Sequence, residues 1–153
     1  MKMKKIAISI FLALLFPVLM FAQDNQNEEK EAIKTVIQTA YVDGLQNNGD
    51  LTKTEDGFHP GFNLLGVRNN GLTKFPIYSW VEYAKHKQKE NPDPPAENEK
   101  VTCEFELIDI TGNAAVAKIE LYKDSKKIYT DYLSLYKFEE GWRIVNKIYF
   151  AHK

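Results

Sequence analysis

Two polar residues interrupt the hydrophobic C-terminal part of the chain, and either could contact a ligand. Asp131 lies near the start of "IYTDYLSLYKF", and Asn146 lies inside "WRIVNKIYF". A buried carboxylate has a raised pKa and can serve as a general acid or base. A buried amide needs hydrogen-bond partners, which can be backbone groups, water, a neighbouring strand or a ligand. Asp131 is therefore a candidate catalytic residue, and Asn146 is a candidate ligand-binding residue.

Both segments are predicted strands, so alternation predicts which side chains share a face. In the second strand the predicted buried face comprises Trp142, Ile144, Asn146, Ile148 and Phe150, and the other face carries Arg143, Val145, Lys147 and Tyr149. In the first strand Asp131 shares an aliphatic face with Leu133, whereas Tyr132 lies on an aromatic and hydroxylic face. Alternation leaves open which of these two faces is inward. Asp131 is thus either a pocket carboxylate near the rim or a rim carboxylate in water.

The three histidines are His59, His86 and His152, and none has metal-ligand spacing to a cysteine, an aspartate or another histidine. We therefore expect no metal site and no cofactor. His59 precedes Pro60 at the start of a predicted hairpin, where it could be a general base or a hydrogen-bond donor. The alternative is a histidine that only closes the turn.

Aromatic residues offer a second kind of contact, because flat apolar ligands bind well against aromatic rings. The chain has eight tyrosines and two tryptophans. Besides Asn146, the candidate ligand-binding residues are Trp142, Tyr41, Trp80 and Tyr132. Each of these rings could instead be an ordinary core residue.

The N-terminus has the order of a secretory signal peptide. Lysines at positions 2, 4 and 5 precede an uncharged apolar stretch over residues 6–22, and polar sequence follows from Gln23. The stretch is at or below the short end of membrane-spanning lengths. We expect cleavage after Ala22 and a secreted or periplasmic product with no lipid-attachment cysteine and no membrane contact. The alternative is a retained N-terminal anchor.

The remainder, residues 23–153, is the size of a single domain. The full chain has 20 basic and 21 acidic residues, and the signal would remove three lysines and no acidic residue. A mildly acidic surface argues against nucleic acid as a partner. The single cysteine, Cys103, lies in a predicted strand and is expected to be a small buried hydrophobe.

Periodicity predicts the elements that position these residues. Apolar residues at three- and four-residue steps from Ile33 to Leu45 indicate an amphipathic helix that ends at "QNNGD". A hairpin follows, with Asn70-Gly71 in its turn. Ser79 and Glu82 have the spacing of a capping box for a second helix from Trp80 to about Lys89. Strands then alternate with short turns to the C-terminus, which predicts an antiparallel meander and an α+β fold.

Four segments, "AYVDGLQNNGD", "FHPGFNLLGV", "IDITGNAAVAKIEL" and "DYLSLYKFEEGWRIVNKIY", follow one another over nearly all of the predicted mature chain. Together they resemble the putative lumazine-binding branch of the nuclear transport factor 2-like superfamily, close to SnoaL-like domains. The resemblance implies a cone-shaped, strongly curved mixed sheet that wraps around a long N-terminal helix and encloses a pocket. It also implies a homodimer through the sheet face. An acidic residue often follows the His-Pro pair in this family, but Gly61 stands there in this chain.

The superfamily includes isomerases, dehydratases, cyclases and transport factors, so its fold does not name a reaction. We interpret the chain as an exported domain that binds a small, partly apolar ligand in its pocket. The first alternative is an enzyme of the isomerase or dehydratase type that uses His59 or Asp131 for proton transfer. The second is a dimeric structural or interaction module whose pocket is filled by side chains.

Overall fold

The computed structural model describes residues 26–153. The predicted signal peptide, residues 1–22, lies outside the described residues. The chain divides into two units, Met1–Ala32 and Ile33–Lys153. In the first unit, the described residues 26–32 are helical. Among the described residues, no helix combines the length and the apolar character needed to cross a membrane.

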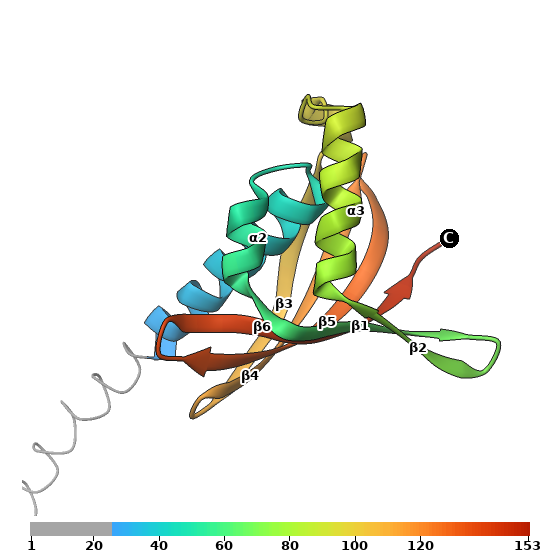
Figure 1. The fold of residues 1–153 in the computed structure, drawn as a ribbon. Coiled ribbons are helices and arrows are strands. Elements are labelled where there is room, and N and C mark those ends of the chain that lie inside the picture. Colours follow the sequence, from blue (N-terminus) through green and yellow to red (C-terminus); the bar gives the residue numbers. More distant parts are fainter. Residues whose placement is uncertain (1–25) are drawn as a thin grey trace, which may run out of the picture. The chain divides into compact units, whose positions relative to one another are not determined.

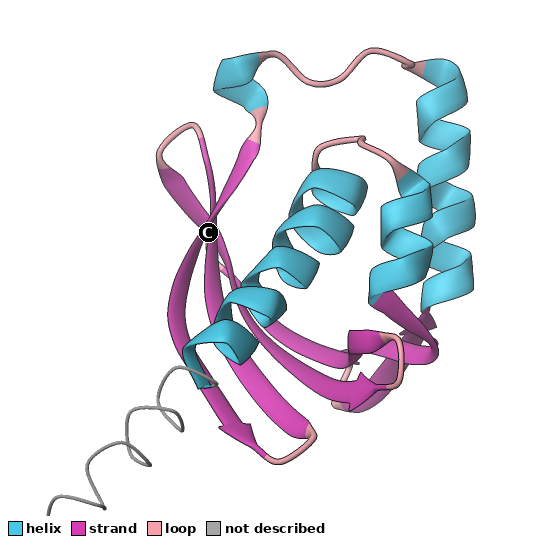
Figure 2. Cartoon of the chain, turned by 90° about the vertical axis from the view of Figure 1, so that its left-hand side faces the viewer, coloured by secondary structure: helices cyan, strands magenta, loops and turns pink. Residues whose placement is uncertain are grey.

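Six strands form one mixed sheet in the Ile33–Lys153 unit. They are β1 (Phe58–Arg68), β2 (Gly71–Pro76), β3 (Val101–Thr111), β4 (Ala114–Lys123), β5 (Lys126–Phe138) and β6 (Gly141–Ala151). Their order in the sheet is β2-β1-β6-β5-β4-β3, and β1 pairs with β6 in parallel while all other neighbours are antiparallel. The sheet is strongly curved, and helices lie on its concave side (Figures 1 and 2). The predicted α+β fold with a curved mixed sheet is therefore confirmed.

The first helix of this unit follows the predicted apolar periodicity. Residues 33–36 are α-helical, and η1 (Ile37–Gln46) is wound as a π-helix. At its end the Asn47 amide donates to the Val42 carbonyl over 3.0 Å, a five-residue step. Asn48, with a φ of 58°, terminates the helix within the predicted segment. Tyr41 lies in the middle of η1 and is completely buried.

The short helix α2 (Leu51–Gly57) fixes the position of η1 at close range. The buried Thr54 hydroxyl donates to the Ala40 carbonyl over 2.8 Å. Gly57 permits this approach, because a Cβ at that position would lie 2.3 Å from the Ala40 Cβ. These contacts hold the turn of η1 that carries Tyr41.

The hairpin turn between β1 and β2 differs by one residue from the prediction. Its two central residues are Asn69 and Asn70, with φ of 52° and 60°, because Arg68 pairs with Gly71. Asparagine tolerates this left-handed conformation better than most residues, so the "NN" pair fills both positions of the turn.

The helix after the hairpin, α3 (Ile77–Glu90), begins earlier than predicted. Pro76 is its N-cap residue, and no side chain caps it, so the predicted capping box of Ser79 and Glu82 does not form the helix start. Proline fixes φ near the helical value and lacks an amide hydrogen, which suits it to the helix entry. Trp80 lies in the first turn of α3 with the earlier start as well.

The core lies between the helices and the concave side of the sheet. Trp142 and Ile144 belong to the same buried cluster as Ile33, Ile37 and Tyr41. The predicted packing of the first helix with the start of β6 is therefore confirmed.

A β-bulge reverses the predicted alternation within β6. Ile144 pairs with Leu135 and Asn146 pairs with Ser134, so Val145 is an extra residue in the ladder. Such a bulge re-aims the side chains beyond it, because strand periodicity shifts by one position.

The side-chain orientations predicted for β6 beyond the bulge are consequently wrong at four positions. Lys147, expected on the solvated face, lies opposite the buried Leu133 and is itself buried. Asn146 lies on the outer face of the sheet instead of beside Ile144. Ile148 and Phe150, both predicted to be buried, are 50% and 63% exposed for the same reason.

Candidate functional site

Three ionisable side chains from η1, β5 and β6 meet in the core. The Tyr41 hydroxyl donates to Asp131 Oδ2 over 2.6 Å. Lys147 Nζ donates to the same carboxylate oxygen over 2.7 Å and to the Tyr41 hydroxyl over 2.5 Å. The exposed fractions of Tyr41, Asp131 and Lys147 are 0%, 0% and 4%. We call these three residues the polar triad.

Each member of the polar triad is inward for a different local reason. Tyr41 lies on the apolar face of η1. Asp131 lies on the aliphatic face of β5 with Leu133, which settles the question left open by alternation. Lys147 is inward because of the bulge at Val145.

Lys147 is a cation in a mostly aromatic environment. Burial lowers the pKa of its ammonium group below the usual 10.5, and the Asp131 carboxylate offsets part of this effect. Its Nζ lies 4.5 Å from the Tyr41 ring centroid, 5.3 Å from that of Tyr149 and 5.6 Å from that of Trp80. Aromatic rings attract a cation, which compensates in part for lost hydration.

Tyr41 and Asp131, the other two members, differ in the hydrogen bonds that their polar atoms form. Burial, followed by the charge of Asp131, raises the pKa of Tyr41 well above 10.0, so its phenol stays protonated. Asp131 Oδ1 is buried and accepts no hydrogen bond from the described residues. A buried oxygen without a donor is costly, and it can accept a proton.

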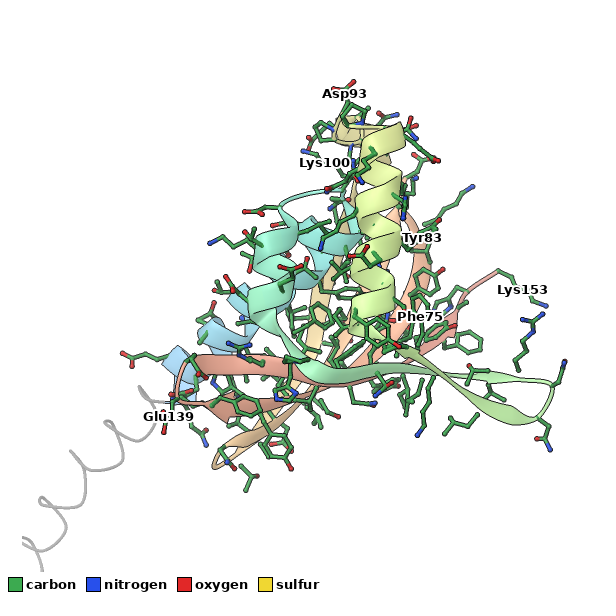
Figure 3. The ribbon with its side chains drawn as sticks, viewed as in Figure 1. Phe75, Tyr83, Asp93, Lys100, Glu139 and Lys153 are labelled. Carbon is green, nitrogen blue, oxygen red and sulfur yellow. The ribbon has the colours of Figure 1, made fainter. Side chains whose placement is uncertain are left out.

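A cavity of about 280 Å³ adjoins the polar triad, and we call it the aromatic cavity. Its lining residues are Tyr41, Leu45, Gln46, Leu64, Trp80, Tyr83, Lys87, Tyr129, Lys147 and Tyr149. They come from η1, α3 and strands β1, β5 and β6, and Tyr83 is labelled on α3 in Figure 3. Aromatic walls around a few polar atoms are typical of small-molecule sites.

The structure brings three of the predicted site residues together. Tyr41 and Trp80 line the aromatic cavity, with ring centroids 5.8 Å apart, and Asp131 lies directly behind Tyr41. Sequence reasoning missed Lys147, because strict alternation placed it in water. The three consecutive apolar residues that follow it, "IYF", fit either face and could have indicated that alternation fails in this strand.

Three other predicted ligand-binding residues lie elsewhere. Asn146 Nδ2 donates to the Asn63 carbonyl of β1 over 3.0 Å. Trp142 is in the core, and Tyr132 is exposed on the outer face. None of the three is among the lining residues of the aromatic cavity.

His59, the second candidate for proton transfer, is also separate from the aromatic cavity. Its Nδ1 accepts a hydrogen bond from the Gly61 amide over 3.0 Å. Its ring stacks on Phe138, with centroids 4.9 Å apart and planes 12° apart. This geometry is that of a histidine that closes the turn around Pro60.

One group of acidic side chains in the described residues could in principle approach a cation. The carboxylates of Glu104, Glu106 and Glu120 lie within 4.8 Å of one another. Glu120 already forms an ion pair with Lys127 and accepts a hydrogen bond from Tyr122. Its charge is therefore compensated by the protein.

Cys103 has the environment of a structural cysteine. It is half-buried on β3, and burial raises the pKa of its thiol to about 12. A thiol with a raised pKa is a poor nucleophile at neutral pH.

Comparison with known proteins gives a consistent family and fold. The sequence profile of the family described as putative lumazine-binding matches residues 28–150. A nuclear transport factor 2-like protein of unknown function from Shewanella baltica is 30% identical, with a TM-score of 0.64 over 82% of this chain and 95% of that chain. A similar protein of unknown function from Methylobacillus flagellatus is 24% identical, with a TM-score of 0.60 over 82% of this chain and 94% of that one.

One similar protein has the name of an enzyme. A protein from Cladobotryum sp. named aldolase FrzH is 26% identical over 120 residues, which are 76% of this chain and 89% of that protein.

Proposed function

The chain belongs to the putative lumazine-binding family of the nuclear transport factor 2-like superfamily, and we propose that its aromatic cavity binds a small, flat, partly apolar molecule with a carbonyl or anionic oxygen. The observation that carries this proposal is the position of Lys147. Its side chain is almost fully buried, and it lines a cavity whose walls are mostly aromatic.

The hydrogen-bonding capacity of Lys147 supports an oxygen ligand. An ammonium group has three donors. Two of them are used by Asp131 Oδ2 and the Tyr41 hydroxyl. A ligand oxygen can accept the third, and Trp80 and Tyr149 can stack against the apolar body of the ligand.

The size of the aromatic cavity limits the ligand. Small-molecule sites usually have volumes of about 300–1,000 Å³. At about 280 Å³, this cavity suits a molecule with one or two rings. Exposed Lys87 lies at the same cavity and adds a second positive charge.

Native mass spectrometry of the protein purified from its own host tests the proposal. We expect a retained small molecule in the wild-type chain and its loss from Trp80→Ala, because the substitution removes one wall of the cavity. Tyr132→Ala is the matched control, since Tyr132 is an aromatic residue on the outer face. Equal retention in both variants would place the ligand outside the aromatic cavity.

A second candidate function is catalysis. In this alternative the protein is an enzyme that acts on a carbonyl compound, and Asp131 transfers protons. It is supported by the polar triad, which puts ionisable groups within hydrogen-bond distance of one another beside a cavity. The relative named aldolase FrzH supports the same reading. In this role Lys147 would hold the substrate oxygen with its third N–H group while Asp131 moves a proton.

We also propose that the protein is exported. The order of charge, apolar stretch and small residue at positions 1–22 supports cleavage after Ala22. The intact mass of the protein from its host should correspond to a chain that starts near Gln23. Recovery of the uncleaved chain from membranes would favour the anchor instead.

A further inference from the structure

We propose that Lys147 is a covalent catalytic residue, whose amine forms an imine with the carbonyl carbon of a small aryl or apolar aldehyde or ketone in the aromatic cavity. This inference rests on the proposed ligand site. The inference goes beyond the ligand site because it assigns a covalent bond to Lys147. The second candidate function above assigns Lys147 only a hydrogen bond to the substrate.

The position of Nζ favours covalent chemistry. An amine acts as a nucleophile when it is desolvated in a hydrophobic pocket. Lys147 meets this condition, because it is 4% exposed and lines the aromatic cavity. Lys87 lines the same cavity but is exposed on α3, so its ammonium group stays hydrated.

The charge of the site is the same before and after the reaction. The starting state has an ammonium group 2.7 Å from Asp131 Oδ2. A protonated imine at the same nitrogen has the same single positive charge. The buried ion pair is therefore kept, and no uncompensated charge is left in the core.

The polar triad can carry the protons that the reaction requires. One ammonium proton moves to Asp131, the Nζ lone pair attacks the carbonyl carbon, and the carboxylic acid returns the proton to the carbonyl oxygen. A second proton then follows the same route from nitrogen to the new hydroxyl group, which leaves as water when the C=N bond forms. The ammonium group thus loses two of its three protons, and both depart in the water molecule.

Two features of Asp131 and Lys147 suit these transfers. Asp131 Oδ1 is buried with no donor among the described residues, so it can hold a proton without breaking an existing hydrogen bond. Burial lowers the pKa of Lys147, which makes release of its first proton easier. The Tyr41 hydroxyl contacts both Asp131 and Lys147, and Tyr41 lines the cavity, so this hydroxyl can pass the proton from Asp131 to the carbonyl oxygen.

Reductive trapping of the full folded chain tests the inference. Benzaldehyde is the probe, and sodium cyanoborohydride donates hydride to a protonated imine, giving a stable secondary amine. We expect one benzyl group per chain by intact mass, mapped to Lys147 by peptide mass spectrometry. The rate at Lys147 should exceed that at Lys87 by at least about tenfold, because only the Lys147 amine is desolvated, and this ratio corresponds to roughly 1.4 kcal/mol in the barrier.

Two variants serve as controls. Lys123→Gln should keep the adduct, because Lys123 is an exposed lysine on β4 that does not line the aromatic cavity. The double variant Lys147→Met with Asp131→Leu should lose it, and replacing both charges together avoids the folding defect expected when one is left unpaired. Circular dichroism checks that this variant is folded.

A third measurement separates this inference from the ligand site. Benzyl alcohol has the shape of benzaldehyde without its carbonyl, and its binding can be followed by Trp80 fluorescence in a Trp142→Phe chain, which has no other tryptophan. Benzyl alcohol binding without a Lys147 adduct would overturn the imine and leave the ligand site standing. Adducts spread over surface lysines, with no binding of benzyl alcohol and no co-purified ligand, would overturn both.

Discussion

Lys147 and Asp131 are each an ionisable residue in a hydrophobic core, and each compensates the charge of the other. Their contact of 2.7 Å is almost fully removed from water. In such pairs the loss of one partner is far more costly than the loss of both, because the remaining charge is buried alone. Tyr41 adds a hydrogen bond to each of them.

This reasoning predicts the stability of three variants. Lys147→Met and Asp131→Leu should each lower the free energy of unfolding by about 3–5 kcal/mol. The double variant should lie close to wild type or above it. Urea unfolding measures all three. A double variant as unstable as the two single variants added together would show that the residues do not act as a pair.

Tyr41 should make stability depend on pH in alkaline solution. The phenol keeps its proton in the folded chain, whereas the unfolded phenol loses it near pH 10.0. Above that pH the folded state binds more protons, so the free energy of unfolding falls as pH rises, by up to about 1.4 kcal/mol per pH unit. Lys147, whose pKa is lowered, contributes in the opposite direction below pH 10.5.

The measurement is a comparison of wild type with Tyr41→Phe by urea unfolding at several pH values above 10. Phenylalanine cannot ionise, so the variant should lose Tyr41's part of the downward slope. The pH dependence of stability that is due to Tyr122 should remain in the variant. The pKa of Tyr122 is raised chiefly by its hydrogen bond to Glu120, which the substitution does not touch. An unchanged slope would mean that Tyr41 ionises alike in both states.

Among the structural elements, the bulged end of β6 is the one that creates the site. If β6 alternated regularly through Val145 without a bulge, Lys147 would point to solvent and Asn146 would lie in the core. The bulge also leaves Asn146 on the outer face, where its amide donates to the Asn63 carbonyl and joins β6 to the parallel strand β1.

Asn146→Leu should therefore act on the β1–β6 pairing and not on the ligand. We expect a loss of about 1 kcal/mol in the free energy of unfolding, the usual contribution of one hydrogen bond. Ligand retention in native mass spectra should be unchanged. Loss of the ligand from a stably folded Asn146→Leu chain would restore the sequence-based prediction that this amide binds it.

Local patterns were sufficient to predict the elements, because each depends on nearby residues. The helix from Ile33 and the strands of the meander follow from apolar periodicity and turn residues. The register between strands is a property of pairs of distant segments. A bulge in β6 has no fixed local signature, so Lys147 was missed although Tyr41 and Asp131 were each identified as candidates.

On the scale of the whole Ile33–Lys153 unit, the two faces of the sheet have different roles. The concave side holds the core, the polar triad and the aromatic cavity. On the outer face Tyr132 and Ile148 are direct cross-strand neighbours, and they are 48% and 50% exposed. Val116 and Tyr136 are also exposed on strands β4 and β5. Apolar side chains grouped in this way are typical of surfaces that bind another protein.

We expect the outer face to form a homodimer, as the family resemblance implies. Replacing both Tyr132 and Ile148 by glutamate would place like charges at the centre of that interface, and desolvating them there is costly. Sedimentation equilibrium should show a dimer for wild type and a monomer for the double variant. Val67→Glu is the matched control, because Val67 is an exposed apolar residue in the β1–β2 hairpin, and this variant should stay dimeric. The monomeric variant should still bind its ligand, since the aromatic cavity opens on the other side of the sheet.

A wild-type chain that is monomeric at all concentrations, or a double variant that remains dimeric, would rule out this face as the interface.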